Sequence, residues 1–154
     1  MGEDLIREIH EAFSLPEQDY TQYAPLTLAY IGDNIYELVN RTVSVARGDR
    51  QVEKLNRECS RRAKAPSQSR MAHFLLPELT EEEQAVYRRG RNATVYTKAK
   101  NATVIEYHEA TGLEAVIGYL YLMGRHQRLT RLLKKGFDFL EKPEDGREKD
   151  RPEE

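Results

Sequence analysis

Hydrophobic residues recur every three or four positions along most of the chain, which is the spacing of amphipathic α-helices. Little of the sequence alternates apolar and polar residues in the way that a half-buried strand does. Helices are therefore expected over residues 3–13, 25–47, 51–63, 66–77, 80–90, 101–123 and 126–140. The pattern predicts an all-α fold.

Several of these helices begin with a specific signal. Pro25 and Pro66 suit a first helical turn, where the missing N–H of proline is not needed. Thr80 and Glu83 have the spacing of a capping box. In the helix that starts at Pro25, positions at helical spacing predict the face turned to the core: Leu28, Ile31, Ile35, Leu38 and Thr42.

Two segments lack the helical pattern. Residues 91–100 (RNATVYTKAK) are expected to form an exposed loop, after which Asn101 caps the next helix. Residues 141–154 are highly charged and have no large apolar side chain, a composition typical of a disordered tail. A chain of 154 residues can bury one good core, so residues 1–140 are expected to form a single domain.

Charge is unevenly distributed along a chain whose formal net charge is −2. Residues 1–49 carry −6, residues 50–100 carry +6, residues 101–140 carry +1 and the tail carries −3. A basic middle third is typical of a protein that binds a polyanion. Solvated helix faces would give the same charges, so both interpretations stay open at this point.

The residue types present exclude several kinds of site. Cys59 is the only cysteine, which rules out an internal disulfide and fits a reducing cytoplasm. Four scattered histidines lack the spacing of zinc ligands. There is no phosphate-binding loop, dinucleotide fingerprint or nucleophile-elbow serine. No apolar run approaches the roughly 18 residues of a membrane span. A cytoplasmic protein is expected.

Two carboxylates stand among apolar neighbours. Asp33 lies in LAYIGDNIYELV directly after Gly32, and Glu114 lies in TGLEAVIGYLYL between Gly112 and Gly118. Glycine permits a close backbone approach, so we expect these two helices to pack tightly. Carboxylates brought together in this way repel unless a proton or a cation lies between them. Mg²⁺ is suitable, because it takes one or two carboxylates and keeps several waters.

A purely structural explanation of the same residues is also open. In that case Asp33 caps or pairs locally, Glu37 pairs with Arg41 one helical turn later, and Glu114 pairs with an arginine. Residue types alone do not decide between a metal site and these local ion pairs.

Four stretches are similar to one known family. LAYIGDNIYE resembles the signature helix of ribonuclease III, and GLEAVIGYLYL resembles the second acidic helix of that family. AKAPSQSRM and EEEQAVYRRGRNAT resemble its compact branch, mini-ribonuclease III, which lacks a double-stranded-RNA-binding domain. The similarity covers roughly residues 22–140. It implies a ribonuclease III endonuclease-domain fold with Asp33 and Glu114 as the catalytic, metal-binding carboxylates.

The resemblance also implies an activity. It implies Mg²⁺-dependent hydrolysis of double-stranded RNA by a homodimer, with 5′-phosphate products and precursor 23S ribosomal RNA as the substrate. Whether a large-subunit ribosomal protein presents that substrate is left open. Larger members of the family carry further acids at the positions of Leu26, Ala29 and Thr111. Their absence supports the alternative of a non-catalytic RNA-binding or ribosome-assembly factor, and a purely structural helical adaptor is a third hypothesis.

Without a separate RNA-binding domain, the catalytic domain has to hold the duplex itself. A-form RNA is gripped mainly through its phosphates and 2′-hydroxyls, which gives the basic middle third a role. The residues expected to contact RNA lie near the helix junction at residue 64 and beside the 91–100 loop: Arg61, Arg62, Lys64, Ser67, Gln68, Arg88, Arg89, Arg91, Lys98 and Lys100.

Overall fold

The computed structural model describes residues 4–93 and 102–142, and within these ranges the chain is helical with no strand. The all-α prediction is therefore confirmed. The elements follow one another as α1 (Leu5–Ala12), the 3₁₀ turn η1 (Tyr20–Gln22), α2 (Pro25–Ala46), α3 (Val52–Ala63), α4 (Ala65–Leu75), the 3₁₀ turn η2 (Leu76–Glu78), α5 (Glu81–Asn92), α6 (Ala102–Leu122) and α7 (His126–Glu141).

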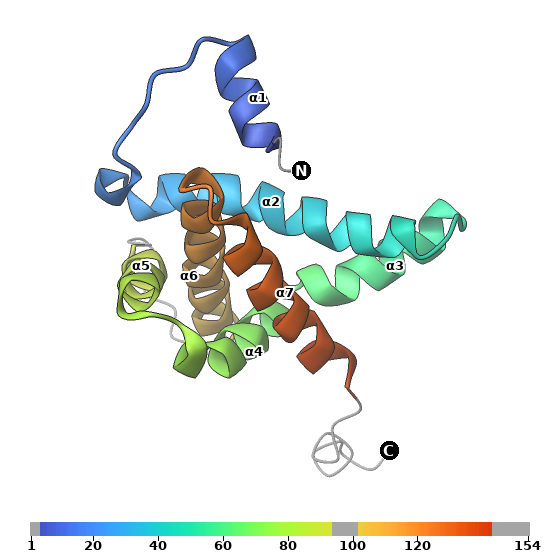
Figure 1. Ribbon diagram of the computed structural model, residues 1–154. Coiled ribbons are helices and arrows are strands. Elements are labelled where there is room, and N and C mark those ends of the chain that lie inside the picture. The colour runs from blue at the N-terminus through green and yellow to red at the C-terminus, as the bar shows by residue number, and fades with distance from the viewer. Residues whose placement is uncertain (1–3, 94–101, 143–154) are drawn as a thin grey trace.

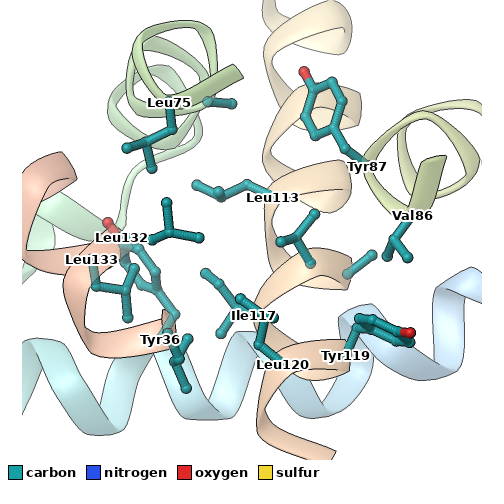
Figure 2. Packing of buried hydrophobic residues seen from close by; sticks show 14 of the residues in the cluster. Tyr36, Leu75, Val86, Tyr87, Leu113, Ile117, Tyr119, Leu120, Leu132 and Leu133 are labelled. Carbon is teal, nitrogen blue, oxygen red and sulfur yellow. The ribbon is translucent and has the colours of Figure 1, made fainter. Parts of the chain in front are cut away.

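Helix α6 is the centre of the fold, and α2, α4, α5 and α7 pack around it (Figure 1). Its middle and C-terminal turns are apolar on almost every side, and a helix of that kind belongs in a protein interior. Figure 2 shows Leu113, Ile117 and Leu120 of α6 among side chains of the surrounding helices. Burying each such aliphatic side chain stabilises the fold by roughly 1.5–3 kcal/mol.

The predicted helix starts are confirmed. Pro25 is the first residue of α2, and Pro66 lies in the first turn of α4. At the start of α5 the capping box is complete: the Glu83 N–H donates to Thr80 Oγ1 at 3.1 Å, and the Thr80 N–H donates to Glu83 Oε1 at 2.9 Å. Helix α5 then continues to Asn92, so the loop predicted from residue 91 begins later. Residues 94–101 lie outside the described ranges.

The face of α2 that is turned to the core differs from the prediction. Leu28 and Ile35 are buried as expected, but Leu38 is 51% exposed and Thr42 is exposed as well. The buried face instead carries small and polar side chains: Ala29, Gly32, Tyr36, Asn40 and Ser44. The physical reason is that α6 and α3 pack on a face rotated away from the apolar stripe, and α3 supplies hydrogen-bond partners for the buried polar groups.

The two ends of the described chain lie at the edges of the helical body. Helix α1 buries none of its residues, and Asp4, which directly precedes it, forms an ion pair with His126 at 3.3 Å. Helix α7 includes Glu141, so the first residue of the predicted tail is helical, and residues after Lys142 lie outside the described ranges. None of the helices described here is long and apolar enough to cross a membrane.

Candidate active site

Helices α2 and α6 cross in direct backbone contact. The backbone of Gly32 lies against the Glu114 carbonyl, and the backbone of Gly118 lies against α2, so that a Cβ at either glycine would overlap the other helix. This confirms the tight packing expected from the glycines beside the two carboxylates. Gly112 has a different partner, because it faces the backbone and ring of Tyr87 in α5.

The crossing brings the side chains of Asp33 and Glu114 together. Asp33 is exposed, whereas Glu114 is partly buried. Burial is the largest cause that raises the pKa of the Glu114 carboxyl; together with a hydrogen bond to Asp33 and the charges of Asp33 and Glu37 it brings this pKa to about 9. At neutral pH, the pair therefore holds one proton unless another cation replaces it.

Mg²⁺ fits this pair of side chains. Both offer carboxylate oxygens, which are the ligands that Mg²⁺ prefers, and the raised pKa of Glu114 marks a position where positive charge is stabilising. In the part of the chain that the structure describes, no group of three or more His, Cys, Asp or Glu residues is placed to hold a metal ion. An ion held by two carboxylates would complete its octahedral shell with water.

The positions where larger relatives carry further acids contribute no charge here. Leu26 is 47% exposed and Ala29 is buried. Thr111 is also buried, and its hydroxyl donates to the Tyr107 carbonyl at 3.0 Å, as a helical threonine commonly does. The two carboxylates are therefore not reinforced from these three positions.

Glu37 is a neighbour that the sequence analysis placed only in a structural role. The predicted pair with Arg41 is confirmed, with 3.3 Å between Arg41 Nε and Glu37 Oε2. Its charge nevertheless reaches Glu114 and helps to raise the pKa of that residue. The signal in the sequence was its position one helical turn after Asp33.

Part of the predicted RNA surface lies in one cationic hollow. Arg61 and Lys64 line a space of about 480 Å³ between α3, the start of α4 and the end of α7, which we call the cationic hollow. Arg47 and Arg70 also line it and were missed: Arg47 lies at the end of α2, away from residue 64 in the sequence, and Arg70 lies in α4 one helical turn after Ser67. Ser67 lies at the hollow but is buried, and its hydroxyl donates to the Arg61 carbonyl at 2.5 Å.

Two of the residues expected to contact RNA are internal. Arg62 is only 4% exposed; its Nε donates to Asn40 Oδ1 at 2.6 Å, and its guanidinium lies 5.3 Å from the centre of the Phe137 ring. Gln68 is also 4% exposed and donates to the Ala63 carbonyl at 3.2 Å. We therefore correct the expected role of Gln68 from RNA contact to support of the helix junction, and the same applies to the buried Ser67. Arg62 also supports the junction, and only its Nη1 edge lines the cationic hollow.

The other predicted RNA residues lie on or after α5. Arg88 and Arg89 are exposed, and Arg89 donates to the Tyr23 carbonyl at 3.0 Å. The Arg91 guanidinium lies over the ring of Tyr87, 5.8 Å from its centre. Lys98 and Lys100 lie outside the described residues.

The similarity of this chain to known proteins extends over both helices that carry the two carboxylates. Residues 26–125, which include Asp33 and Glu114, match the Ribonuclease III domain. The chain is 46% identical over 118 residues to the Mini-ribonuclease 3 of Symbiobacterium thermophilum, covering 77% of this chain and 91% of the relative. It is 44% identical over 119 residues to the Mini-ribonuclease 3 of Clostridium tetani, covering 77% of this chain and 79% of that protein.

A solved structure shows the same fold. The crystal structure of a Fusobacterium nucleatum protein superposes with a TM-score of 0.70 at 30% identity, covering 79% of this chain and 98% of the other. Sequence and structure thus agree over the region that contains both carboxylates and the helices that carry them. The chain belongs to the ribonuclease III family of endoribonucleases and, within it, to the compact mini-ribonuclease III branch.

Proposed function

We propose that this endoribonuclease cleaves double-stranded RNA with Mg²⁺ held by Asp33 and Glu114. The observation that carries the proposal is the glycine crossing of α2 and α6, which brings the two carboxyl groups together at the edge of the helical body. Two carboxylates side by side need a proton or a cation between them, and a purely structural role gives no reason to hold them together.

The two residues have different tasks in this proposal. Glu114, partly buried among apolar residues of α6, would hold the cation in place of its proton. Asp33 is exposed, on the side from which the phosphodiester backbone of the RNA would approach. When bound, Mg²⁺ supplies activation of a water molecule and positive charge beside the scissile phosphate. Hydrolysis then breaks the bond between phosphorus and the 3′-oxygen, which leaves a 5′-phosphate and a 3′-hydroxyl.

The cationic hollow is proposed to hold the duplex by its backbone. Arg47, Arg61, Lys64 and Arg70 come from three helices, and each can neutralise a phosphate without reading a base. A second contact region is proposed on α5, through the exposed Arg88 and Arg89. Binding of this kind depends on counterion release and weakens steeply with salt.

The enzyme is proposed to act as a homodimer, with one cutting centre for each strand. Support comes from exposed apolar side chains along α2, which we call the α2 stripe: Leu26, Tyr30, Leu38 and Val45. Tyr30 is 83% exposed, which is unusual for a large aromatic side chain with nothing against it. Leu38 and Val45 also line, together with Asp33, a hollow of about 690 Å³. A second copy of the chain is the occupant that we propose for this face.

The substrate is proposed to be precursor 23S ribosomal RNA, whose paired ends form an A-form duplex in the cytoplasm. Support for this finer assignment is the resemblance to the compact branch of the family. Residues 1–140 would then be the catalytic domain, and 141–154 a tail outside it. A large-subunit ribosomal protein is kept as a candidate partner, which a comparison of naked and protein-bound precursor would test.

One assay tests the activity and the site together. A perfectly paired RNA duplex is incubated with the protein in Mg²⁺ and in EDTA, and Asp33→Asn and Glu114→Gln are compared with the wild type. Both variants are expected to lose cleavage by about 100-fold or more while keeping duplex binding. Equal cutting by all three proteins would refute the site. Binding without cleavage by the wild type in any divalent cation would instead favour the non-catalytic RNA-binding factor.

A further inference from the structure

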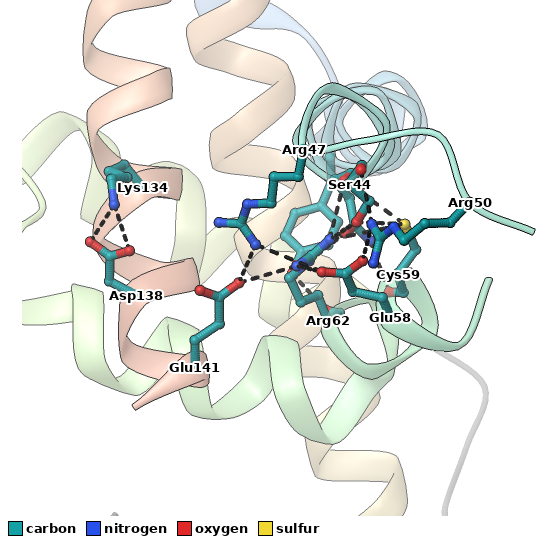
Figure 3. A network of polar contacts seen from close by, with 11 residues as sticks. Ser44, Arg47, Arg50, Glu58, Cys59, Arg62, Lys134, Asp138 and Glu141 are labelled. Carbon is teal, nitrogen blue, oxygen red and sulfur yellow. Dashed lines mark hydrogen bonds and ion pairs between the residues drawn. The ribbon is translucent and has the colours of Figure 1, made fainter. Parts of the chain in front are cut away.

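The cationic hollow already contains two carboxylates. Five cationic side chains and two acidic ones line it: Arg47, Arg61, Arg62, Lys64 and Arg70 against Glu58 and Glu141. Figure 3 shows Glu141 reaching from the last turn of α7 toward Arg47 and Arg62. The Oε1 atom of Glu141 lies 3.2 Å from Nη1 of each arginine. A single oxygen thus lies between two guanidinium groups, as a phosphate oxygen would.

The location of Glu141 is unfavourable within its own helix. It is the last residue of α7, where the helix dipole repels negative charge. Asp138, three residues earlier, pairs inside the helix, with Lys134 Nζ at 2.7 Å. Glu141 instead makes its ion pairs across the hollow, with arginines of α2 and α3. The ion pairs with Arg47 and Arg62 that stabilise the Glu141 carboxylate are therefore the same ion pairs that an RNA phosphate in the hollow would form.

The second carboxylate in the hollow is held more firmly. Glu58 lies in the middle of α3, and the hydrogen bond from Arg50, 2.6 Å away, is the main cause that lowers the pKa of Glu58. Its side chain is 21% exposed, against 40% for Glu141. A residue at a helix end can also withdraw by fraying the last turn, which a residue in mid-helix cannot do. Of the two carboxylates, Glu141 is therefore the one that can move out of the hollow.

We propose that the Glu141 carboxylate occupies the position of an RNA phosphate in the cationic hollow and is displaced when a duplex binds. The inference rests on the proposed function, because it assumes that this hollow holds the RNA backbone. In the free enzyme the Glu141 carboxylate pairs with Arg47 and with the Nη1 edge of Arg62 at 3.2 Å, closer than Glu58, which lies 3.7 and 3.8 Å from the same two nitrogens. An entering duplex has to break these ion pairs, so Glu141 weakens RNA binding and favours release of the cut product.

The test compares two carboxylates of the same helix. Binding of a short RNA duplex is measured in EDTA for the wild type, for Glu141→Gln and for the matched control Asp138→Asn. Glu141→Gln is expected to lower Kd by about two- to fivefold, the range for a partly exposed ion pair, and Asp138→Asn to leave Kd unchanged. In an Arg47→Gln background the gain from Glu141→Gln should shrink, because the two residues act on the same phosphate.

The outcomes separate this inference from the proposed function. If the wild type neither binds nor cuts duplex RNA, the proposed function fails. If the wild type binds and cuts, but Glu141→Gln binds equally or more weakly, only the role of Glu141 is overturned. Glu141→Ser is a second variant, and both are measured below their own unfolding temperatures, so that a loss of stability is not mistaken for a loss of affinity.

Discussion

The backbone carbonyl of Glu114 lies directly against Gly32, so that the peptide that carries one carboxylate touches the residue that precedes the other. This contact leaves no room for a side chain at position 32. The spacing of the two carboxyl groups is therefore set by helix backbones, which move less than side chains do. The backbone that carries Asp33 is held in place by the same contact, although the Asp33 side chain is exposed.

Gly32→Ala is predicted to destabilise the fold although alanine is the better helix former. The helix propensity of alanine favours the variant by about 1 kcal/mol. Its Cβ would overlap the Glu114 carbonyl, and overpacking of this kind typically costs about 1–3 kcal/mol, so the steric effect should win. Urea denaturation measures the difference. Asn34→Ala, at an exposed position of the same helix, is the control and should change stability by less than about 0.5 kcal/mol.

Stability without Mg²⁺ is predicted to fall as the pH rises from about 5 to 9. In the folded protein the pKa of Glu114 is raised to about 9, whereas a free glutamate titrates near 4.3. The folded state therefore keeps a proton that the unfolded chain releases in this window. The stabilisation is complete below the lower value and lost as the pH approaches the higher one, by at most about 1.4 kcal/mol per pH unit.

Chemical denaturation at several pH values measures this slope. Glu114→Gln should flatten it, because glutamine has no proton to release. Mg²⁺ at pH 8 should raise the stability of the wild type and leave Glu114→Gln almost unchanged. A wild-type slope that survives the substitution would mean that another group titrates.

Arg61 and Arg62 are predicted to have opposite phenotypes. Arg62→Ala leaves Asn40 and Glu141 without their buried partner, and removing one member of such a network typically costs about 3–5 kcal/mol. Arg61→Ala removes an exposed side chain and should leave stability nearly unchanged. It should instead weaken duplex binding and lower the slope of log Kd against log salt by roughly 0.7–0.9, the effect of one phosphate contact. Thermal unfolding and a salt titration of RNA binding separate the two.

Leu38→Glu is predicted to disrupt the proposed homodimer. A charge in the middle of the exposed α2 stripe would be buried without a partner if a second copy covers that face. Sedimentation velocity at several concentrations measures the change. Val52→Glu is the control, since Val52 is 65% exposed on α3, away from the stripe. Dimers of the Leu38 variant with wild-type affinity would exclude this face as the interface.

The meeting of Asp33 and Glu114 could be predicted from the sequence because both residues are unusual in an apolar helix. A glycine and a carboxylate in an apolar helix both cost stability, and in Asp33 and Glu114 the same contradiction occurs twice. The helix starts were predictable for a similar reason, since Pro25 and the Thr80 capping box act locally. Signals of this kind can be read without knowing which helices pack against each other.

Other features depend on packing and could not be predicted. Arg61 and Arg62 are adjacent in a basic run, yet one helical step of about 100° turns one outward and the other into the interior. Leu38 was expected in the core because apolar periodicity does not tell a face that covers the core from one that covers a partner. Arg47 and Glu141 meet at the hollow across 94 positions of sequence, which no local pattern encodes.

The glycine crossing also has a consequence for the synthesis of the protein. Asp33 and Glu114 are 81 positions apart, so α2 leaves the ribosome long before α6 is complete. Until α6 docks, Gly32 has no partner backbone and the chain holds only one of its two carboxylates. A nascent or truncated chain that ends before α6 therefore lacks half of the proposed site. The pair of carboxylates is completed only when translation of the chain is almost finished.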